Sequence, residues 1–100
     1  MIFLNLNIFV DKIEFFVFKN ESHNNSCILK NKIIMPKSFD IGNKLNYIRK
    51  YIESIINIHN VEFGYINIDK FTLENNFINI LKVEGIIEEL FSNCGVKICR

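Results

Sequence analysis

The chain has 100 residues, of which 49% are hydrophobic and 23% charged, with four glycines and one proline. A chain of this length and composition has to bury most of its apolar side chains, which excludes disordered and fibrous proteins and predicts one globular domain over residues 1–100. The net charge of +1 excludes the strong overall attraction that a very basic domain has for nucleic acid or anionic lipid. Any affinity for nucleic acid must therefore be local.

The cysteine pattern and the N-terminal segment indicate where the protein works. Three cysteines, Cys27, Cys94 and Cys99, have no C-x-x-C spacing, and Cys94 with Cys99 has no histidine nearby, so we expect reduced thiols. The apolar residues 2–10 are too few to span a bilayer and lack the basic start and small-residue cleavage site of a signal peptide. We expect a cytoplasmic protein with no membrane association.

The first third of the chain predicts three strands. Residues 2–10 are β-branched or aromatic with Asn5 and Asn7 interleaved, and a tight turn at Asp11-Lys12 leads to a second run over 13–18. A polar loop over 19–25 precedes a third extended run over 27–35, and Pro36 ends it. Three strands in succession suggest an antiparallel meander.

Two of these runs are apolar on both faces. This pattern is expected where helices cover one face of a sheet and another element partly covers the other. We therefore place three aromatic residues of the second run in the core: Phe15, Phe16 and Phe18.

The rest of the chain alternates helices and strands. Apolar residues recur at three- and four-residue steps from Ile41, with Asp40 as N-cap, and His59-Asn60 ends this helix. A strand over 61–68 contains Gly64, where another element can approach closely. A second helix begins after a Thr72 cap and ends at 93–95, with Gly95 as left-handed C-cap, before a last strand over 96–99. Right-handed crossovers then make the fourth and fifth strands parallel to the first.

Three stretches resemble the RuvC-type Holliday-junction resolvases, a branch of the ribonuclease-H-like superfamily. Residues 3–7 stand where that family has an I-L-G-I-D strand, and residues 44–48, continued by 61–67, are similar to its R-L-x-x-I helix and second acidic strand. Residues 77–87 are similar to its A-L-K-L-x-x-x-x-G-V-I segment, with Gly85 at the helix glycine. The resemblance covers the whole chain but only about the first two thirds of such an enzyme. It implies an α/β fold with a ribonuclease-H-like core and a mixed five-stranded sheet.

The chemistry of that family requires carboxylates from separate elements, because two divalent metals activate water and stabilise the leaving oxygen. The first position corresponds to Asn7 and the second to Ile66 or Asn67, while the remaining acids would lie beyond Arg100. A neutral amide supplies no negative charge to a hard cation. The resemblance therefore implies a site with no catalytic residues and no cofactor.

One alternative retains a metal. Asp69 follows Asn67 by two residues and would share its face, so that with Asp11 or Glu62 it could hold one ion. Mg²⁺ would be required only under this residual-nuclease hypothesis. A solvated acid at the end of a strand is the other interpretation of Asp69.

A basic patch is the candidate for nucleic-acid contact. Five residues of the first predicted helix would form it together with Lys30, Lys32 and Lys37, the tyrosines serving as stacking groups: Lys44, Tyr47, Arg49, Lys50 and Tyr51. Ordinary solvated charge is the alternative interpretation of the same residues.

Three functions therefore remain open. The leading hypothesis is a catalytically silent RuvC-like domain that binds DNA, RNA or a protein partner. The second is a small homodimeric or inhibitor-like interaction domain, since so small a domain has difficulty burying every phenylalanine. The third is a residual metal-dependent nuclease fragment.

Overall fold

Five strands and two helices make up the described part of the computed structural model, which comprises residues 1–21, 24–34, 40–68 and 77–99. In chain order the elements are β1 (Ile2–Ile8), β2 (Lys12–Glu21), β3 (Asn24–Ile34), α1 (Ile41–His59), β4 (Phe63–Ile68), α3 (Phe77–Asn93) and β5 (Lys97–Cys99). Thr72 and Asp69, named above as a helix cap and a candidate ligand, lie outside these residues.

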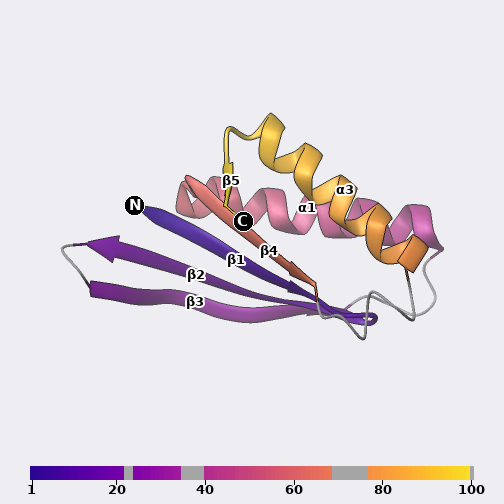
Figure 1. The fold of residues 1–100 in the computed structure, drawn as a ribbon, viewed down its shortest axis with the longest axis horizontal. Helices are drawn as coiled ribbons and strands as arrows, with labels where there is room; N and C mark the ends of the chain where they lie inside the picture. The colour runs from indigo at the N-terminus through magenta and orange to yellow at the C-terminus, as the bar shows by residue number, and fades with distance from the viewer. Residues whose placement is uncertain (22–23, 35–39, 69–76, 100) are drawn as a thin grey trace.

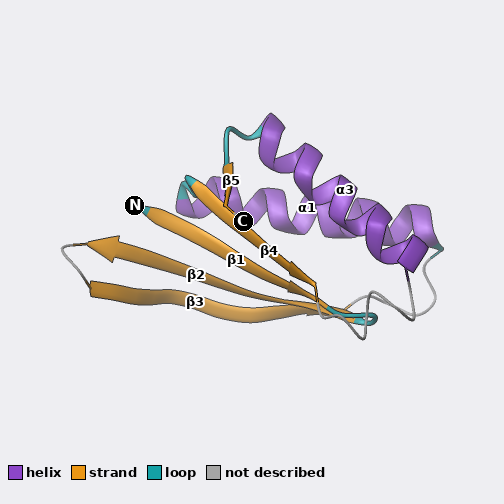
Figure 2. Ribbon diagram, in the orientation of Figure 1, coloured by secondary structure: helices purple, strands orange, loops and turns teal. Residues whose placement is uncertain are grey.

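The strands form one mixed sheet in the order β3-β2-β1-β4-β5. β1, β2 and β3 pair antiparallel, whereas β4 runs parallel to β1 and β5 runs parallel to β4. Both helices lie on the same face of this sheet (Figures 1 and 2). The predicted meander and the predicted parallel crossover strands are therefore confirmed.

Helix ends follow the local sequence signals. The side chain of Asp40 accepts a hydrogen bond from the Asn43 backbone N–H at 2.8 Å and so caps the start of α1. At its other end Asn60 adopts a left-handed conformation (φ 54°), and its N–H donates to the Ile56 carbonyl. Gly95 likewise has a positive φ of 73° after α3, as its sequence position predicted.

The hydrophobic core lies between the sheet and the helices. Alternate residues of β1 and β2 face the helices and are at most 1% exposed: Leu4, Leu6, Ile8, Ile13, Phe15 and Val17. They pack in one cluster with buried residues of both helices, among them Ile48, Ile52, Ile87 and Phe91. Each such side chain stabilises the fold by about 1.5–3 kcal/mol through removal of apolar surface from water.

Gly64 allows α3 to approach the sheet. A Cβ atom at this position would collide with the Phe91 ring, 2.8 Å from its Cζ atom and closer still to Cε2. The close approach predicted for this glycine is therefore confirmed, and it fixes the distance between β4 and the last turns of α3.

Two predictions about the lengths and the faces of the first three strands are wrong. Residues 19–21 and 24–25, expected in a polar loop, extend β2 and β3, and Asn20 pairs with Asn25 at a hairpin tip whose polar side chains face solvent. Phe16 and Phe18, placed in the core with Phe15, lie on the opposite face of the sheet and are partly exposed. The reason is the two-residue period of a strand, which puts Phe15 on one face and its even-numbered neighbours on the other.

No helix in the described ranges is long and apolar enough to cross a membrane.

Candidate functional site

The face of the sheet opposite the helices carries the residues at which the sequence predicted a degenerate site. We call it the open face, because no described helix covers it (Figure 2). Strand register arranges its side chains in rows. One row, here the polar row, contains Lys32 on β3, Glu14 on β2, Asn7 on β1 and Asn67 on β4.

Asn7 and Asn67 are direct partners in the parallel pairing of β1 with β4. The two positions aligned with family carboxylates therefore do meet at neighbouring strand ends. Ile66, the other candidate for the second position, packs against the core instead. Of the two residues offered by the sequence, Asn67 is the one on the open face.

The amide of Asn67 is committed to hydrogen bonds within the sheet. Its Nδ2 donates to Oδ1 of Asn5 at 2.5 Å and to the Leu6 carbonyl at 3.4 Å. Asn67 therefore acts here as a hydrogen-bond donor through Nδ2, whereas a carboxylate at the same position could only accept. The first of these contacts joins β4 to a side chain of β1 and the second joins it to the β1 backbone.

Glu14 is the acid that sequence reasoning missed. It lies directly across from Asn7 on β2, and its Oε1 is 3.3 Å from Nζ of Lys12, with both side chains 35% exposed. The position of the β1–β2 turn decides which residue lies across from Asn7. The Phe9 N–H donates to the Lys12 carbonyl, so the turn is centred on Val10-Asp11. A turn at Asp11-Lys12, as predicted, would have placed Phe16 opposite Asn7, because moving the turn by one residue changes every pairing in the hairpin.

A pair of divalent cations does not fit this row. Its described residues offer two neutral amides and one carboxylate that is already paired with Lys12, and Lys32 lies across from that carboxylate. Glu62 immediately precedes β4, roughly 16 Å along the chain from Asn67, so these two residues cannot bind the same ion. Among the residues that the structure describes, no three histidine, cysteine or acidic side chains come together.

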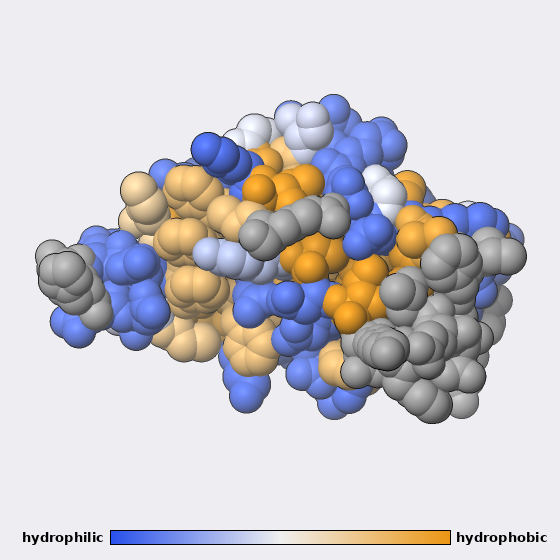
Figure 3. All heavy atoms as spheres, in the orientation of Figure 1, coloured by the Kyte–Doolittle hydropathy of each residue, from blue (hydrophilic) through white to orange (hydrophobic). Residues whose placement is uncertain are grey.

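Aromatic side chains occupy the rest of the open face. Five of them, here the aromatic band, come from β1, β2 and β4: Phe3, Phe16, Phe18, Phe63 and Tyr65. The Phe3 ring stacks with Phe18 and with Phe63 at centroid distances of 5.1 Å each, and with Tyr65 at 6.0 Å. Figure 3 shows light-orange, moderately hydrophobic surface gathered over the strands near the start of β1.

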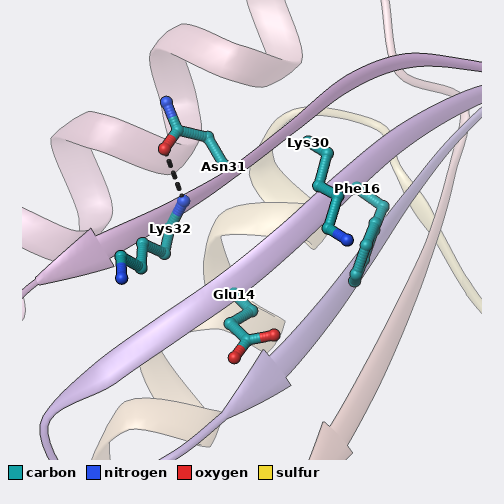
Figure 4. Close-up of a pocket in the computed structure, with 5 residues that line it drawn as sticks. All are labelled: Glu14, Phe16, Lys30, Asn31 and Lys32. Carbon is teal, nitrogen blue, oxygen red and sulfur yellow. Dashed lines mark hydrogen bonds between the residues drawn. The ribbon is translucent and has the colours of Figure 1, made fainter.

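Lysines lie at the edges of the band. The Lys30 ammonium on β3 is 5.3 Å from the centroid of the Phe16 ring, within cation–π distance. Lys97 on β5 is the register partner of Phe63 at the opposite edge. Phe16 and the residues Glu14, Lys30, Asn31 and Lys32 line a shallow depression of about 350 Å³ (Figure 4).

The residues predicted as nucleic-acid contacts lie on α1, behind the sheet as seen from the open face. Tyr51 packs edge-on against Phe15 at 5.9 Å and is 6.2 Å from Tyr47, and both rings pack against the core. Arg49 points toward α3, where it is 3.7 Å from Glu89.

The structure thus divides the predicted basic patch. Tyr47 and Lys50 share a shallow surface depression, and Lys44 lines another with Phe9 and Ile80. Lys30 and Lys32 are on the other face of the sheet, while Lys37 is outside the described residues. Helix α1 and strand β3 therefore do not form one continuous basic surface.

Comparison with known proteins identifies the fold. No protein-family model and no curated protein sequence matches the chain. Among solved structures, RuvC from Thermus thermophilus is similar with a TM-score of 0.80 and 8% identity, over 98% of this chain and 59% of that one. T. thermophilus RuvC in complex with a Holliday junction substrate has a TM-score of 0.83 and 10% identity, over 98% of this chain and 63% of that one. An Aquifex aeolicus PPX-GPPA enzyme has a TM-score of 0.61 and 13% identity, over 98% of this chain and 34% of that one.

These similarities are in fold rather than in sequence. The chain spans about three fifths of the RuvC chains that it matches. Identities of 8–13% carry the arrangement of strands and helices and nothing about activity. The chain therefore has an α/β fold with a ribonuclease-H-like core, as the resemblance of its short motifs implied.

Proposed function

We propose that this chain is a nucleic-acid-binding module with a ribonuclease-H-like fold that does not carry out metal-dependent cleavage. The observation that carries the proposal is the pairing of Asn7 with Asn67, where the resembled enzymes have carboxylates, together with the Asn67–Asn5 hydrogen bond. Two metals at that position would have to be held by the neutral amides of Asn7 and Asn67, and the Asn67 amide already donates a hydrogen bond to Asn5.

The binding half of the proposal is supported by fold and by charge. A solved neighbour with the same fold, T. thermophilus RuvC, is in complex with a Holliday junction substrate. The open face of the present chain carries Lys12, Lys30, Lys32 and Lys97 against one described acid, Glu14. Lysines on one face supply the local attraction for phosphate that a net charge of +1 does not supply overall.

Binding and cleavage are tested together with labelled four-way junction and single-stranded DNA at low salt. We expect mobility shifts at micromolar protein that weaken steeply with added salt, and intact DNA after incubation with Mg²⁺ or Mn²⁺. No shift on either DNA would overturn the nucleic-acid function and leave a protein partner as the ligand.

Cleavage would be decisive in the other direction. Metal-dependent products that disappear in Asp69→Asn would establish a residual nuclease and contradict the proposal. A Glu53→Gln variant serves as the matched control, because Glu53 is exposed on α1, on the helix-covered side of the sheet.

A further inference from the structure

We infer that the aromatic band is a stacking surface for the bases of single-stranded nucleic acid, with the edge lysines Lys30 and Lys97 on its phosphates. This inference rests on the proposed function and specifies the ligand and its surface. It places the ligand on the open face, away from the α1 residues that the sequence favoured.

The aromatic band is not required to complete the core. The covered face of the sheet is filled by residues that are at most 1% exposed, such as Leu6 and Phe15, packed against both helices. Phe16, Phe18 and Tyr65 remain partly exposed on the other face. Aromatic side chains that stay partly exposed side by side on one face of a domain are typical of a binding surface.

The charge of the open face selects an anionic ligand. Four lysines against one glutamate give the described part of this face an excess of positive charge, whereas α1 and α3 together carry four basic and four acidic residues. Two copies meeting through this face would bring like charges together. A second copy is therefore disfavoured, and a polyanion is favoured.

The chemistry of the band favours unpaired bases among polyanions. Its rings are presented on a sheet, and the depression beside Phe16 is shallow, so this surface suits a flat ligand better than a helix. Aromatic residues on an exposed sheet stack with bases that are free of partners, while bases inside a duplex already stack on each other. Lys30 lies over Phe16, and Lys97 lies beside Phe63. These two ammonium groups can therefore contact the phosphates of a single nucleic-acid strand whose bases stack on the band.

Tryptophan fluorescence can test this contact directly, because the chain contains no tryptophan. Phe16→Trp places a single fluorophore in the band, and Ile58→Trp places one on α1 at a site that is 73% exposed. On titration with oligo(dT) at low salt we expect strong quenching of Phe16→Trp and little change in Ile58→Trp. Equal quenching of both variants, or none in Phe16→Trp while the DNA binds, would overturn the inference.

Loss of the ring provides an independent measurement. Phe16→Leu should weaken binding of labelled oligo(dT) in fluorescence anisotropy by roughly 5- to 150-fold, the loss typical of one stacked base. Circular dichroism confirms that the variant is folded. Unchanged affinity in folded Phe16→Leu would exclude the band as the contact surface.

The lysines are tested by the salt dependence of the same binding. Lys30→Gln and Lys97→Gln should each lower the slope of log affinity against log salt by about 0.7, the value for one phosphate on a single strand. Lys82→Gln on α3 is the matched control and should leave the slope unchanged.

The outcomes separate this inference from the proposed function. Failure of the wild-type protein to bind any nucleic acid would remove both. Binding that is insensitive to Phe16 and Lys30 but is lost in Lys50→Gln or Tyr47→Ala would retain the function and move the ligand to α1. Light scattering completes the test, since a dimer dissociated by Phe16→Leu would show a second copy on the open face and overturn the inference.

Discussion

The two faces of the sheet are built from the same strands and differ in what covers them. On β2, Phe15 is 1% exposed under the helices, whereas Phe16, the next residue along the chain, is partly exposed with Lys30 over its ring. On β1, Leu6 belongs to the core and Asn7 to the polar row. The difference shows that in this chain hydrophobicity alone does not assign a residue to the core; its place in the two-residue period does.

The largest expected effect separates the two adjacent phenylalanines. Phe15→Ala should lower the free energy of unfolding by about 3–5 kcal/mol, because it opens a cavity under α1. Phe16→Ala should cost less than about 2 kcal/mol, since its ring is only partly removed from water. Urea denaturation followed by circular dichroism measures both, and equal losses would show that the open face is covered in solution.

Gly64 tests how tightly the covered face is packed. Gly64→Ala should destabilise the protein by about 1–3 kcal/mol, because the new Cβ meets the Phe91 ring. Gly85 on α3 is the matched control, as a Cβ there has no described neighbour within 4 Å. Gly85→Ala should raise stability by about 0.5–1 kcal/mol through helix propensity alone. Thermal unfolding compares the pair, and similar behaviour of both variants would contradict the close packing.

The polar row can be given the carboxylates of the enzymes that the sequence resembles. Asn7→Asp with Asn67→Asp places two carboxylates on adjacent strands and removes the Asn67–Asn5 hydrogen bond, so we expect a loss of up to about 1 kcal/mol at low salt. Millimolar Mn²⁺ should restore part of this stability in the double variant and leave the wild type unchanged.

A matched control for that experiment exists at the β2–β3 hairpin. Asn20 and Asn25 are also register partners, far from the polar row, and both are exposed. Asn20→Asp with Asn25→Asp should show no specific Mn²⁺ effect in the same thermal-shift measurement. A wild-type protein stabilised by Mn²⁺ would contradict our assignment of the amide site.

The smallest expected effect concerns thiol reactivity. Burial raises the pKa of the Cys94 thiol, the charge of Glu53 raises it further, and Arg49 opposes both. At pH 8 Cys94 therefore has less thiolate than an ordinary cysteine, and its reactivity should rise only at higher pH. Cys27 is exposed on the open face. Iodoacetamide followed by peptide mass spectrometry should find Cys27 modified first; faster modification of Cys94 would show that the covered side opens.

Much of the fold could be predicted from the sequence because its signals are local. The Asp40 cap, the end of α1 at His59-Asn60 and the left-handed Gly95 each depend on a few neighbouring residues. The parallel direction of β4 and β5 follows from the handedness of crossovers, which holds for almost any sequence. These features required no knowledge of distant contacts.

The candidate site was predicted only in part. Asn7 and Asn67 were identified because short motifs resemble a known strand and its partner, and the structure places them side by side. Glu14 was missed because its position opposite Asn7 depends on a turn that lies one residue earlier than expected. The lysines of β3 were grouped with α1, although the sheet separates them.

The sequence by itself determined the order of elements, their caps and the residue types that each strand presents. Tertiary structure decided which side chains share a face and which of those faces is covered. The physical reason is that periodicity and capping act within a few residues, while cross-strand neighbours depend on register between segments as far apart as Asn5 and Asn67. The open face, with its polar row and aromatic band, is therefore a property of the assembled sheet.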